Sequence, residues 1–474
     1  MLFYSRRRFL PDRFHEILRS FLQKPGLPFA DVLPAERIQA LFDEEGVSFG
    51  EGENDVYTPA ITLWAFLSQV LFKGEQRSCV AAVARVMVLL VALGKKPCSN
   101  NTGDYCRARA KLSEKALERL TCELADGCES QVPDDWLWHG RHVHLVDGTT
   151  VSMPDTDANQ AAYPQNPEQK EGLGFPIIRM VVLLSLATAM LSGMALAPYQ
   201  GKGTGELALL RRLLDRFKQG DILLADSLYC TYFMIAFLQE RGIDFVVRLH
   251  QRRSADFQRG RRLGKEDHVV TWARPIKPNW MDQATYDRMP ESIEVREVRV
   301  RVNQPGFRVE SFVVVSSLID HEGCSKADLA VLYRRRWLVE LDIRAIKINL
   351  DIDVLRCRTP EMIRKELWTS LLAYNLVRQV MLQAANRASL LPRQLSFSAA
   401  IQTIAASWLV MLATDDPVGS RLVDAALTNL AGHVVGNRPN RVEPRAIKRR
   451  PKEHRLLTKP RAQARAELLA GVTT

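Results

Sequence analysis

Residues 142–147, His-Val-His-Leu-Val-Asp, form a short alternating stretch that ends on an aspartate. Alternation of polar and apolar side chains with a period of two predicts a β-strand. Residues 221–225, Asp-Ile-Leu-Leu-Ala, form a second short strand pattern, and Asp226 follows it. The sequence therefore predicts two strands that each place a carboxylate at the strand end. Gly148, directly after Asp147, indicates that the first strand ends abruptly and that another chain can approach closely there.

The residues between and after these two stretches alternate between strand and helix patterns. Strands are expected at 142–146, 177–187, 190–198, 222–225 and 245–249, and helices at 203–218 and 232–241. Thr204 is the expected N-cap of the first helix, with Glu206 in its first turn. The long apolar run 181–197 is short for a membrane span and contains small and polar residues, so two core strands fit it better. We infer an α/β fold of the ribonuclease H-like type, with a mixed sheet and flanking helices.

A third carboxylate, Glu340, lies in a helical pattern at 333–347. At about 100° per residue, Tyr333, Arg336, Glu340 and Lys347 fall within a sector of roughly 60°, spread over about 21 Å of a regular helix. One face would therefore carry a carboxylate with a cationic group on either side.

The three carboxylates suggest a common chemistry. Mg²⁺ prefers hard oxygen ligands, and a two-metal site needs only a few carboxylates. Asp147, Asp226 and Glu340 can therefore converge on a pair of Mg²⁺ ions, with cations where a phosphate backbone would pass. This arrangement indicates phosphodiester chemistry on nucleic acid.

Each of these residues also has a purely structural interpretation. Arg336 and Glu340 are spaced for an i, i+4 salt bridge. Asp147 before a glycine is typical of a β-turn, and Asp226 before Ser-Leu-Tyr can cap a helix. The placement of all three carboxylates together favours a catalytic role over these alternatives.

The composition agrees with a nucleic-acid partner. The 474 residues include 65 Lys and Arg against 54 Asp and Glu, and the pI is near 9.3. Such a balance favours a polyanion. The eight cysteines form no C-x-x-C pair, so we expect reduced thiols in a cytoplasmic protein. Residues 5–10 resemble a twin-arginine export signal, but charged residues follow at once, so export is not expected.

The histidines near the first strand invite a separate interpretation. His142 and His144 alternate with Leu145 and Asp147, so they are expected to face away from Asp147. A separate metal site that also uses His139 is therefore not favoured.

Three blocks of the sequence resemble the DDE transposases of insertion sequence family four. The spacing Tyr333-x2-Arg336-x3-Glu340-x6-Lys347 matches the Y-R-E-K signature of that family, and residues 147–150 and 224–229 resemble the blocks that carry its two aspartates. The resemblance implies a DNA transposase of the bacterial cytoplasm or nucleoid that performs cut-and-paste transposition. It would act by metal-dependent phosphodiester hydrolysis and strand transfer at terminal inverted repeats.

The same resemblance implies a role for each residue. Asp147, Asp226 and Glu340 would be the metal-binding catalytic triad, with Mg²⁺ as the cofactor and Mn²⁺ as a substitute. The DNA-binding residues would be Tyr333, Arg336 and Lys347, of which the two cations contact phosphates.

The partners implied are double-stranded DNA, as terminal inverted repeats and as target, and a second copy of the chain in a synaptic complex, with no membrane partner. Family members often form a DNA hairpin at the transposon end. An aromatic residue of their insertion often stabilises a flipped base, and the sequence does not choose between Trp272 and Trp280.

The expected organisation has five parts. These are an N-terminal helical domain for DNA-end recognition (1–135), the first part of the catalytic domain (136–250), a β-rich insertion (251–321), the rest of the catalytic domain with the Glu340 helix (322–385), and C-terminal helices with a basic tail (386–474).

Patterns within these parts predict their elements. Helices are expected at 62–71, 79–93 and 104–124, and the cations of the third fit DNA contact and a solvated surface equally well. Alternating runs at 293–302 and 307–315 flank a turn signal at 303–306. Residues 438–465 are rich in Lys, Arg and Pro, which predicts an extended or disordered tail.

Two other functions fit the same residues. One is a ribonuclease H-like nuclease without strand transfer, and the other is a non-enzymatic DNA-binding protein derived from a transposase. The presence of all three carboxylates argues against the second.

Overall fold

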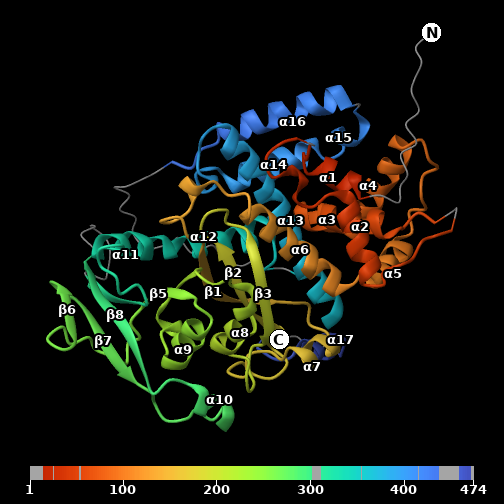
Figure 1. Ribbon diagram of the computed structural model, residues 1–474. Coiled ribbons are helices and arrows are strands. Elements are labelled where there is room, and N and C mark those ends of the chain that lie inside the picture. The colour runs from red at the N-terminus through yellow and green to blue at the C-terminus, as the bar shows by residue number, and fades with distance from the viewer. Residues whose placement is uncertain are drawn as a thin grey trace.

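One continuous β-sheet runs through the described part of the chain, in the order β3-β2-β1-β4-β5-β9-β8-β7-β6 (Figure 1). The computed structural model describes residues 14–24, 26–52, 55–301, 311–353, 355–414, 416–436 and 458–470. The strands are β1 (Val143–Ser152), β2 (Ile177–Ser185), β3 (Leu191–Pro198), β4 (Ile222–Ala225), β5 (Asp244–Arg248), β6 (Arg261–Gly264), β7 (Asp267–Ala273), β8 (Ser292–Arg301) and β9 (Ser311–Ser316). The prediction of a mixed α/β sheet with helices is confirmed.

The first five strands change direction in the middle of the sheet. β1, β2 and β3 are antiparallel neighbours, whereas β4 runs parallel to β1 and β5 runs parallel to β4. β2 and β3 are joined by a short turn at 186–190, which suits antiparallel strands, while β4 and β5 are joined through a helix. The apolar run 181–197 forms much of β2 and β3, as predicted.

β1 continues beyond the point at which the sequence predicts its end. Asp147 pairs with Val182, and the antiparallel pairing with β2 extends to Ser152. The prediction of a strand that ends at Gly148 is therefore wrong. What ends there is the parallel pairing with β4, whose last aligned pair is Leu145 with Leu224.

Different helices cover the two faces of this part of the sheet (Figure 1). Leu145 belongs to a core shared with α6 (Glu114–Glu129) and α13 (Pro360–Arg387), whereas Val146 belongs to a core shared with α8 (Glu206–Arg212) and α9 (Tyr232–Glu240). Because side chains alternate across a strand, Asp147 lies on the α13 face and Gly148 on the α8 face.

The helix predicted at 203–218 is shorter than expected. It consists of α8 and a 3-10 turn, Leu214–Arg216. Its N-cap is Gly205 rather than Thr204, whose hydroxyl donates to the carbonyl of Gly201 instead.

The strands of residues 251–321 continue the same sheet. β9 pairs antiparallel with β5, and β8, β7 and β6 follow in turn. Residues 293–301 and 311–315 of the runs predicted at 293–302 and 307–315 lie in β8 and β9, while residues 302 and 307–310 lie outside the described residues. The helix α10 (Gln283–Arg288) lies between β7 and β8. The turn signal at 303–306 lies outside the described residues. This β-rich segment is thus joined to the central sheet by backbone hydrogen bonds.

The N-terminal and C-terminal helices share one core. Trp408 lies between them, with its ring centroid 5.6 Å from that of Trp64 and 5.1 Å from that of Phe21. The remaining helices are α1 (His15–Ser20), α2 (Ala35–Glu44), α3 (Pro59–Leu71), α4 (Cys79–Ala92), α5 (Thr102–Lys111), α7 (Asp157–Ala162), α11 (Lys326–Arg334), α12 (Leu338–Arg344), α14 (Phe397–Ser407), α15 (Val410–Ala413), α16 (Asp416–Ala431) and α17 (Arg461–Leu469).

The helix predicted at 104–124 is two helices, α5 and α6. Ser113 separates them, because its side chain caps α6 by accepting a hydrogen bond from the backbone N–H of Ala116. Arg119 of α6 donates to Glu44 and Glu45. These contacts engage Arg119 with carboxylates of the protein itself.

Most of the predicted basic tail, residues 437–457, lies outside the described residues. The prediction of an extended chain is wrong at its end, where α17 is helical. Among the helices described, none combines the length and the apolar character needed to cross a bilayer.

Candidate active site

Asp147 and Asp226 occupy matching positions on neighbouring strands. The parallel register aligns Leu145 with Leu224, and each aspartate follows two residues later. Both side chains therefore project from the same face, where β4 ends. Burial raises the pKa of Asp147 to about 6, the backbone N–H of Gly148 opposes the rise, and the negative charge of Asp226 adds to it. The fold thus brings two carboxylates to one place.

Asp226 also caps a short turn. Its Oδ1 accepts a hydrogen bond of 2.8 Å from the backbone N–H of Leu228, at the start of the 3-10 turn Ser227–Tyr229. The capping interpretation is therefore correct for one carboxylate oxygen. A carboxylate offers about four lone-pair positions, so capping leaves capacity for a further partner.

Glu340 lies on α12, which contacts β1 (Figure 1). Nη2 of Arg336 donates to Glu340 Oε1 at 2.6 Å, so the i, i+4 salt bridge is present. The charge of Arg336 also opposes the rise that burial causes in the pKa of Asp147. Arg336 is consequently within electrostatic reach of both Glu340 and Asp147.

The carboxylates do not form a closed metal site in this conformation. Within the described residues, no group of three His, Cys, Asp or Glu side chains is arranged to hold a metal ion. Glu340 is engaged by Arg336, and its side chain is 36% exposed. The structure therefore brings Asp147 and Asp226 together and keeps Glu340 nearby in an ion pair.

The segment that carries Glu340 is not a regular α-helix. A 3-10 turn, Arg335–Trp337, separates α11 from α12, and a π-helical turn, Ala345–Asn349, follows α12. The single stripe calculated for a regular helix therefore does not hold. Single π turns within helices are frequent at functional sites.

Because the segment is irregular, Tyr333 and Lys347 contact different parts of the sheet. Tyr333 is buried with its ring centroid 5.1 Å from that of Phe312 on β9, and burial raises the pKa of its hydroxyl to about 12. Lys347 Nζ donates to Thr149 Oγ1 at 3.3 Å and to the carbonyl of Thr150 at 3.0 Å. Tyr333 thus braces the helix against the sheet, while Lys347 lies beside the residues that follow Asp147.

Glu206 is a fourth carboxylate at the site, and the sequence analysis did not place it there. A Cβ built on Gly148 would lie 2.2 Å from Glu206 Cδ and 2.5 Å from both carboxylate oxygens. The hydroxyl of Tyr229 donates to Glu206 Oε2 at 3.2 Å, and burial raises the pKa of Glu206. Gly148 leaves the space that this carboxylate occupies. The glycine after Asp147 was a signal of close approach, but the sequence did not identify the group that approaches.

The histidines near β1 have separate carboxylate partners. His142 Nδ1 lies 2.8 Å from Glu129 Oε1, and His144 Nε2 lies 3.1 Å from Asp221 Oδ2. Both pairs are distinct from the group around Asp147.

The two tryptophans considered for contact with a flipped base differ in exposure. Trp272 is buried, and its Nε1 donates to Glu297 Oε1 at 3.1 Å. Trp280 is 43% exposed, with the guanidinium of Arg211 3.9 Å from its ring centroid. Of the two, Trp280 is the one with an accessible ring.

Comparisons with known proteins place this arrangement in a family. The family described as "Transposase DDE domain" matches residues 138–376, half of the chain. The chain is 26% identical over 352 residues to the transposase InsG for insertion sequence element IS4 of Escherichia coli (strain K12), which covers 73% of this chain and 76% of that protein. It is 27% identical over 139 residues to the putative transposase InsZ of the same organism, covering 29% and 45%.

Among solved structures, the piggyBac transposase synaptic complex with hairpin DNA aligns over 89% of this chain and 86% of that chain, with a TM-score of 0.41 and 10% identity. The family match includes every candidate residue from Asp147 to Lys347 and extends over half of the chain. We conclude that the chain belongs to the DDE transposases.

Proposed function

We propose that this transposase cleaves and joins DNA at a metal-dependent site formed by Asp147, Asp226 and Glu340. The observation that carries the proposal is the parallel register of the neighbouring strands β1 and β4. This register places the two aspartates at matching positions, where β4 ends. Carboxylate oxygens are the hard ligands that Mg²⁺ prefers, and Mn²⁺ accepts the same donors.

The electrostatics of the site fit a divalent cation. Burial is the main cause that raises the pKa of Asp147 to about 6, and the negative charges of Asp226 and Glu206 add to it. A divalent cation would offset both effects. Glu340 would complete the ligand set by leaving Arg336, and its partly exposed side chain permits this exchange. When bound, the metal ions would activate the attacking oxygen and stabilise the leaving oxygen of an in-line displacement.

The cationic residues would then bind the DNA. Once Glu340 turns away, the guanidinium of Arg336 is free to hold a phosphate through two parallel hydrogen bonds. Lys347, beside Thr149 and Thr150, would contact a second phosphate. Tyr333 would support both by fixing the helix against β9.

We propose cut-and-paste transposition as the reaction. Hydrolysis at the terminal inverted repeats would release a 3′-hydroxyl, and the same residues would direct it to a phosphodiester of the target DNA. Both steps are in-line displacements, so one site serves both. The substrate is double-stranded DNA, held by a homodimer in the bacterial cytoplasm.

The order of strands supports a ribonuclease H-like catalytic core. Three antiparallel strands are followed by two parallel ones; Asp147 lies on β1, and Asp226 directly follows the neighbouring strand β4. In this proposal, residues 1–135 recognise the DNA ends, and residues 251–321 are the insertion that extends the sheet.

Joining of a labelled terminal-repeat oligonucleotide to plasmid DNA in Mg²⁺ tests the proposal. We expect Asp147→Asn, Asp226→Asn and Glu340→Gln to lose cleavage and joining, and Asp215→Asn, at a side chain that is 92% exposed, to retain both. Cleavage without joining would indicate a nuclease. DNA binding with neither reaction would indicate a DNA-binding protein derived from a transposase.

A further inference from the structure

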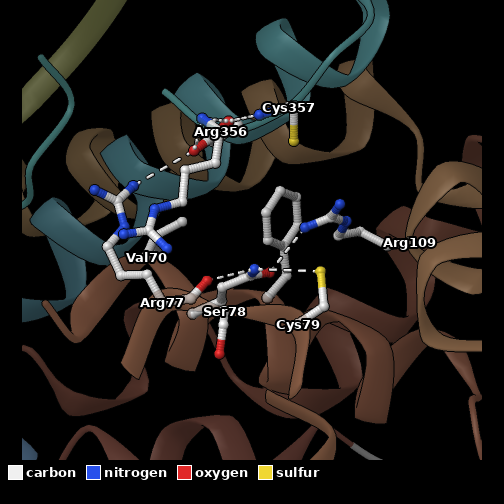
Figure 2. A pocket seen from close by; sticks show the side chains of 10 residues that line it. Val70, Arg77, Ser78, Cys79, Arg109, Arg356 and Cys357 are labelled. Carbon is white, nitrogen blue, oxygen red and sulfur yellow. Dashed lines mark hydrogen bonds and ion pairs between the residues drawn. The ribbon is translucent and has the colours of Figure 1, made fainter. Parts of the chain in front are cut away.

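A cavity of about 110 Å³ lies between the N-terminal helices and the start of α13, apart from the catalytic carboxylates (Figure 2). Residues of α3, α4 and α5 form one side, and Arg356, Cys357 and Glu366 form the other. At ~30 Å³ for each water molecule, this volume corresponds to about four waters. The space suits a small ion and is too small for a nucleotide.

Three arginines line this cavity. Arg77 and Arg356 are close enough for their charges to interact, and Arg109 faces them from the opposite side (Figure 2). Glu366 is the acidic residue among the described lining residues. The cavity wall therefore carries an excess of positive charge.

Glu366 is already committed to other partners. Its carboxylate accepts hydrogen bonds from the backbone N–H of Arg356, at 3.1 and 3.0 Å, and of Cys357, at 2.9 Å. It also contacts Arg77 Nη2 at 3.4 Å. It thus fixes the backbone before α13 and neutralises at most one of the three guanidinium groups.

The other two arginines have neutral partners. Arg109 Nη1 donates to Gln69 Oε1 at 2.8 Å, and Arg356 Nη2 donates to the carbonyl of Gly74 at 2.9 Å. Neither forms an ion pair with a carboxylate within the described part of the chain.

Two charged donors in this wall are also left without a hydrogen bond. Arg77 is only 1% exposed, and its Nε is buried with no partner among the described residues. The Nε of Arg109 is also buried, and it too has no hydrogen-bond partner among the described residues. A buried charged donor without a partner is costly, so a ligand with several acceptor oxygens would stabilise this wall.

We propose that this cavity binds one small tetrahedral oxyanion of the phosphate type. Four acceptor oxygens match guanidinium groups that converge from opposite sides, and charge-assisted hydrogen bonds of this kind are strong. The anion would join the N-terminal helices to the residues that lead into α13. This site is independent of the catalytic carboxylates.

Calorimetric titration of the full chain with inorganic phosphate, in chloride buffer of matched ionic strength, tests the proposal. We expect saturable binding at one site, and a rise in Tm of about 2 °C at tenfold excess over Kd. Arg109→Gln should weaken phosphate binding by about tenfold or more. Arg107→Gln, on the same helix at an exposed arginine that pairs with Asp104, should bind phosphate like the wild type.

A second variant keeps the test decisive if Arg109→Gln does not fold. Arg356 is exposed, and Arg356→Gln should also weaken phosphate binding about tenfold. If phosphate raised the Tm of all variants equally, the stabilisation would be a non-specific effect of the salt, and the proposal would be overturned. If the wild type showed no heat of binding, the cavity would be filled by water, and the proposal would again be overturned.

A final arm replaces phosphate with a short DNA duplex. The proposal expects Arg356→Gln to bind the duplex as tightly as the wild type does. If this variant lost duplex affinity while phosphate did not bind, the site would belong to the DNA backbone and the free-anion assignment would fail.

Discussion

The candidate catalytic aspartates and Asp342 are carboxylates in contrasting electrostatic surroundings. Asp342, on α12, is 2% exposed and accepts hydrogen bonds from Arg378 at 2.9 Å and Arg393 at 2.8 Å. Asp147 faces Asp226 instead, and mainly because of burial its pKa rises to about 6. The charge of Asp342 is neutralised by arginines of the protein itself. In the proposed function, the charges of Asp147 and Asp226 are neutralised by a bound cation.

The Asp342 cluster also anchors the helix that carries Glu340. Arg393 donates to the carbonyls of Leu186 and Ser185 at the turn between β2 and β3, at 2.6 and 2.7 Å. The two residues of α12 therefore have different tasks. Asp342 fixes the helix to the sheet, whereas Glu340 is partly exposed and pairs with Arg336.

The largest effect is expected from Asp147→Asn. Removal of a catalytic carboxylate should reduce DNA cleavage by at least about a thousandfold. The Tm should stay constant or rise, because one of several repelling charges is lost. An assay of cleavage beside a thermal melt measures both, and a variant that unfolded instead would show that Asp147 is structural.

Asp342→Ala should have its main effect on stability. It leaves the guanidinium groups of buried Arg378 and partly buried Arg393 without a carboxylate, which should cost about 3–5 kcal/mol of unfolding free energy. Asp424→Ala is the matched control, since it breaks the exposed pair with Arg387 of α13 and should cost about 1 kcal/mol or less. Equal losses in urea titrations would remove the contrast between the two regions.

The stability of the metal-free protein should depend on pH through Asp147. Its pKa is higher in the folded state, so the folded state holds the proton more tightly than the unfolded chain does. Stability should therefore fall as the pH rises from about 4 to about 6, by roughly 2–3 kcal/mol relative to Asp147→Asn. Urea titrations in EDTA measure this difference. A curve for the variant parallel to that of the wild type would contradict the assignment.

The smallest effect is expected from Glu206→Gln. This residue lies against Gly148 and is not one of the two aspartates that the register of β1 and β4 brings together. We therefore expect about tenfold weaker affinity of the variant for Mg²⁺ and little change in stability. Calorimetric titration with Mg²⁺ measures the affinity. A loss as large as that of Asp147→Asn would place Glu206 among the principal ligands.

Much of the catalytic core could be predicted from local patterns. Alternation and turn residues located the first five strands, and the spacing around Glu340 located the helical segment. Some errors came from contacts between distant residues, since β1 extends past Gly148 because β2 pairs with it. Others were local, since the cap at Ser113 divides the helix predicted at 104–124. The sequence made no prediction on whether the β-rich segment joins the main sheet, which it does through the pairing of β9 with β5.

For the candidate site, too, local sequence patterns predicted some features and missed others. The residue types and their spacing predicted Asp147, Asp226 and Glu340 as the candidate residues, because few chemistries need two carboxylates from strand patterns and one from a helical pattern. Glu206 was missed because its approach to Gly148 spans 58 positions of the chain and no periodicity records it. The split of the helix into 3-10, α and π turns was also beyond a calculation that assumes one regular geometry.

The sequence by itself predicted which side chains are candidates for the chemistry and on which kind of element each lies, since both depend on residues close together in the chain. Only the tertiary structure decided which charges distant in the chain meet. The strand register joined Asp147 to Asp226, and the packing of α12 brought Arg378 and Arg393 to Asp342, whereas the pair of Arg336 and Glu340 follows from their i, i+4 spacing. Electrostatic interactions depend on distance and burial, and both are properties of the folded chain.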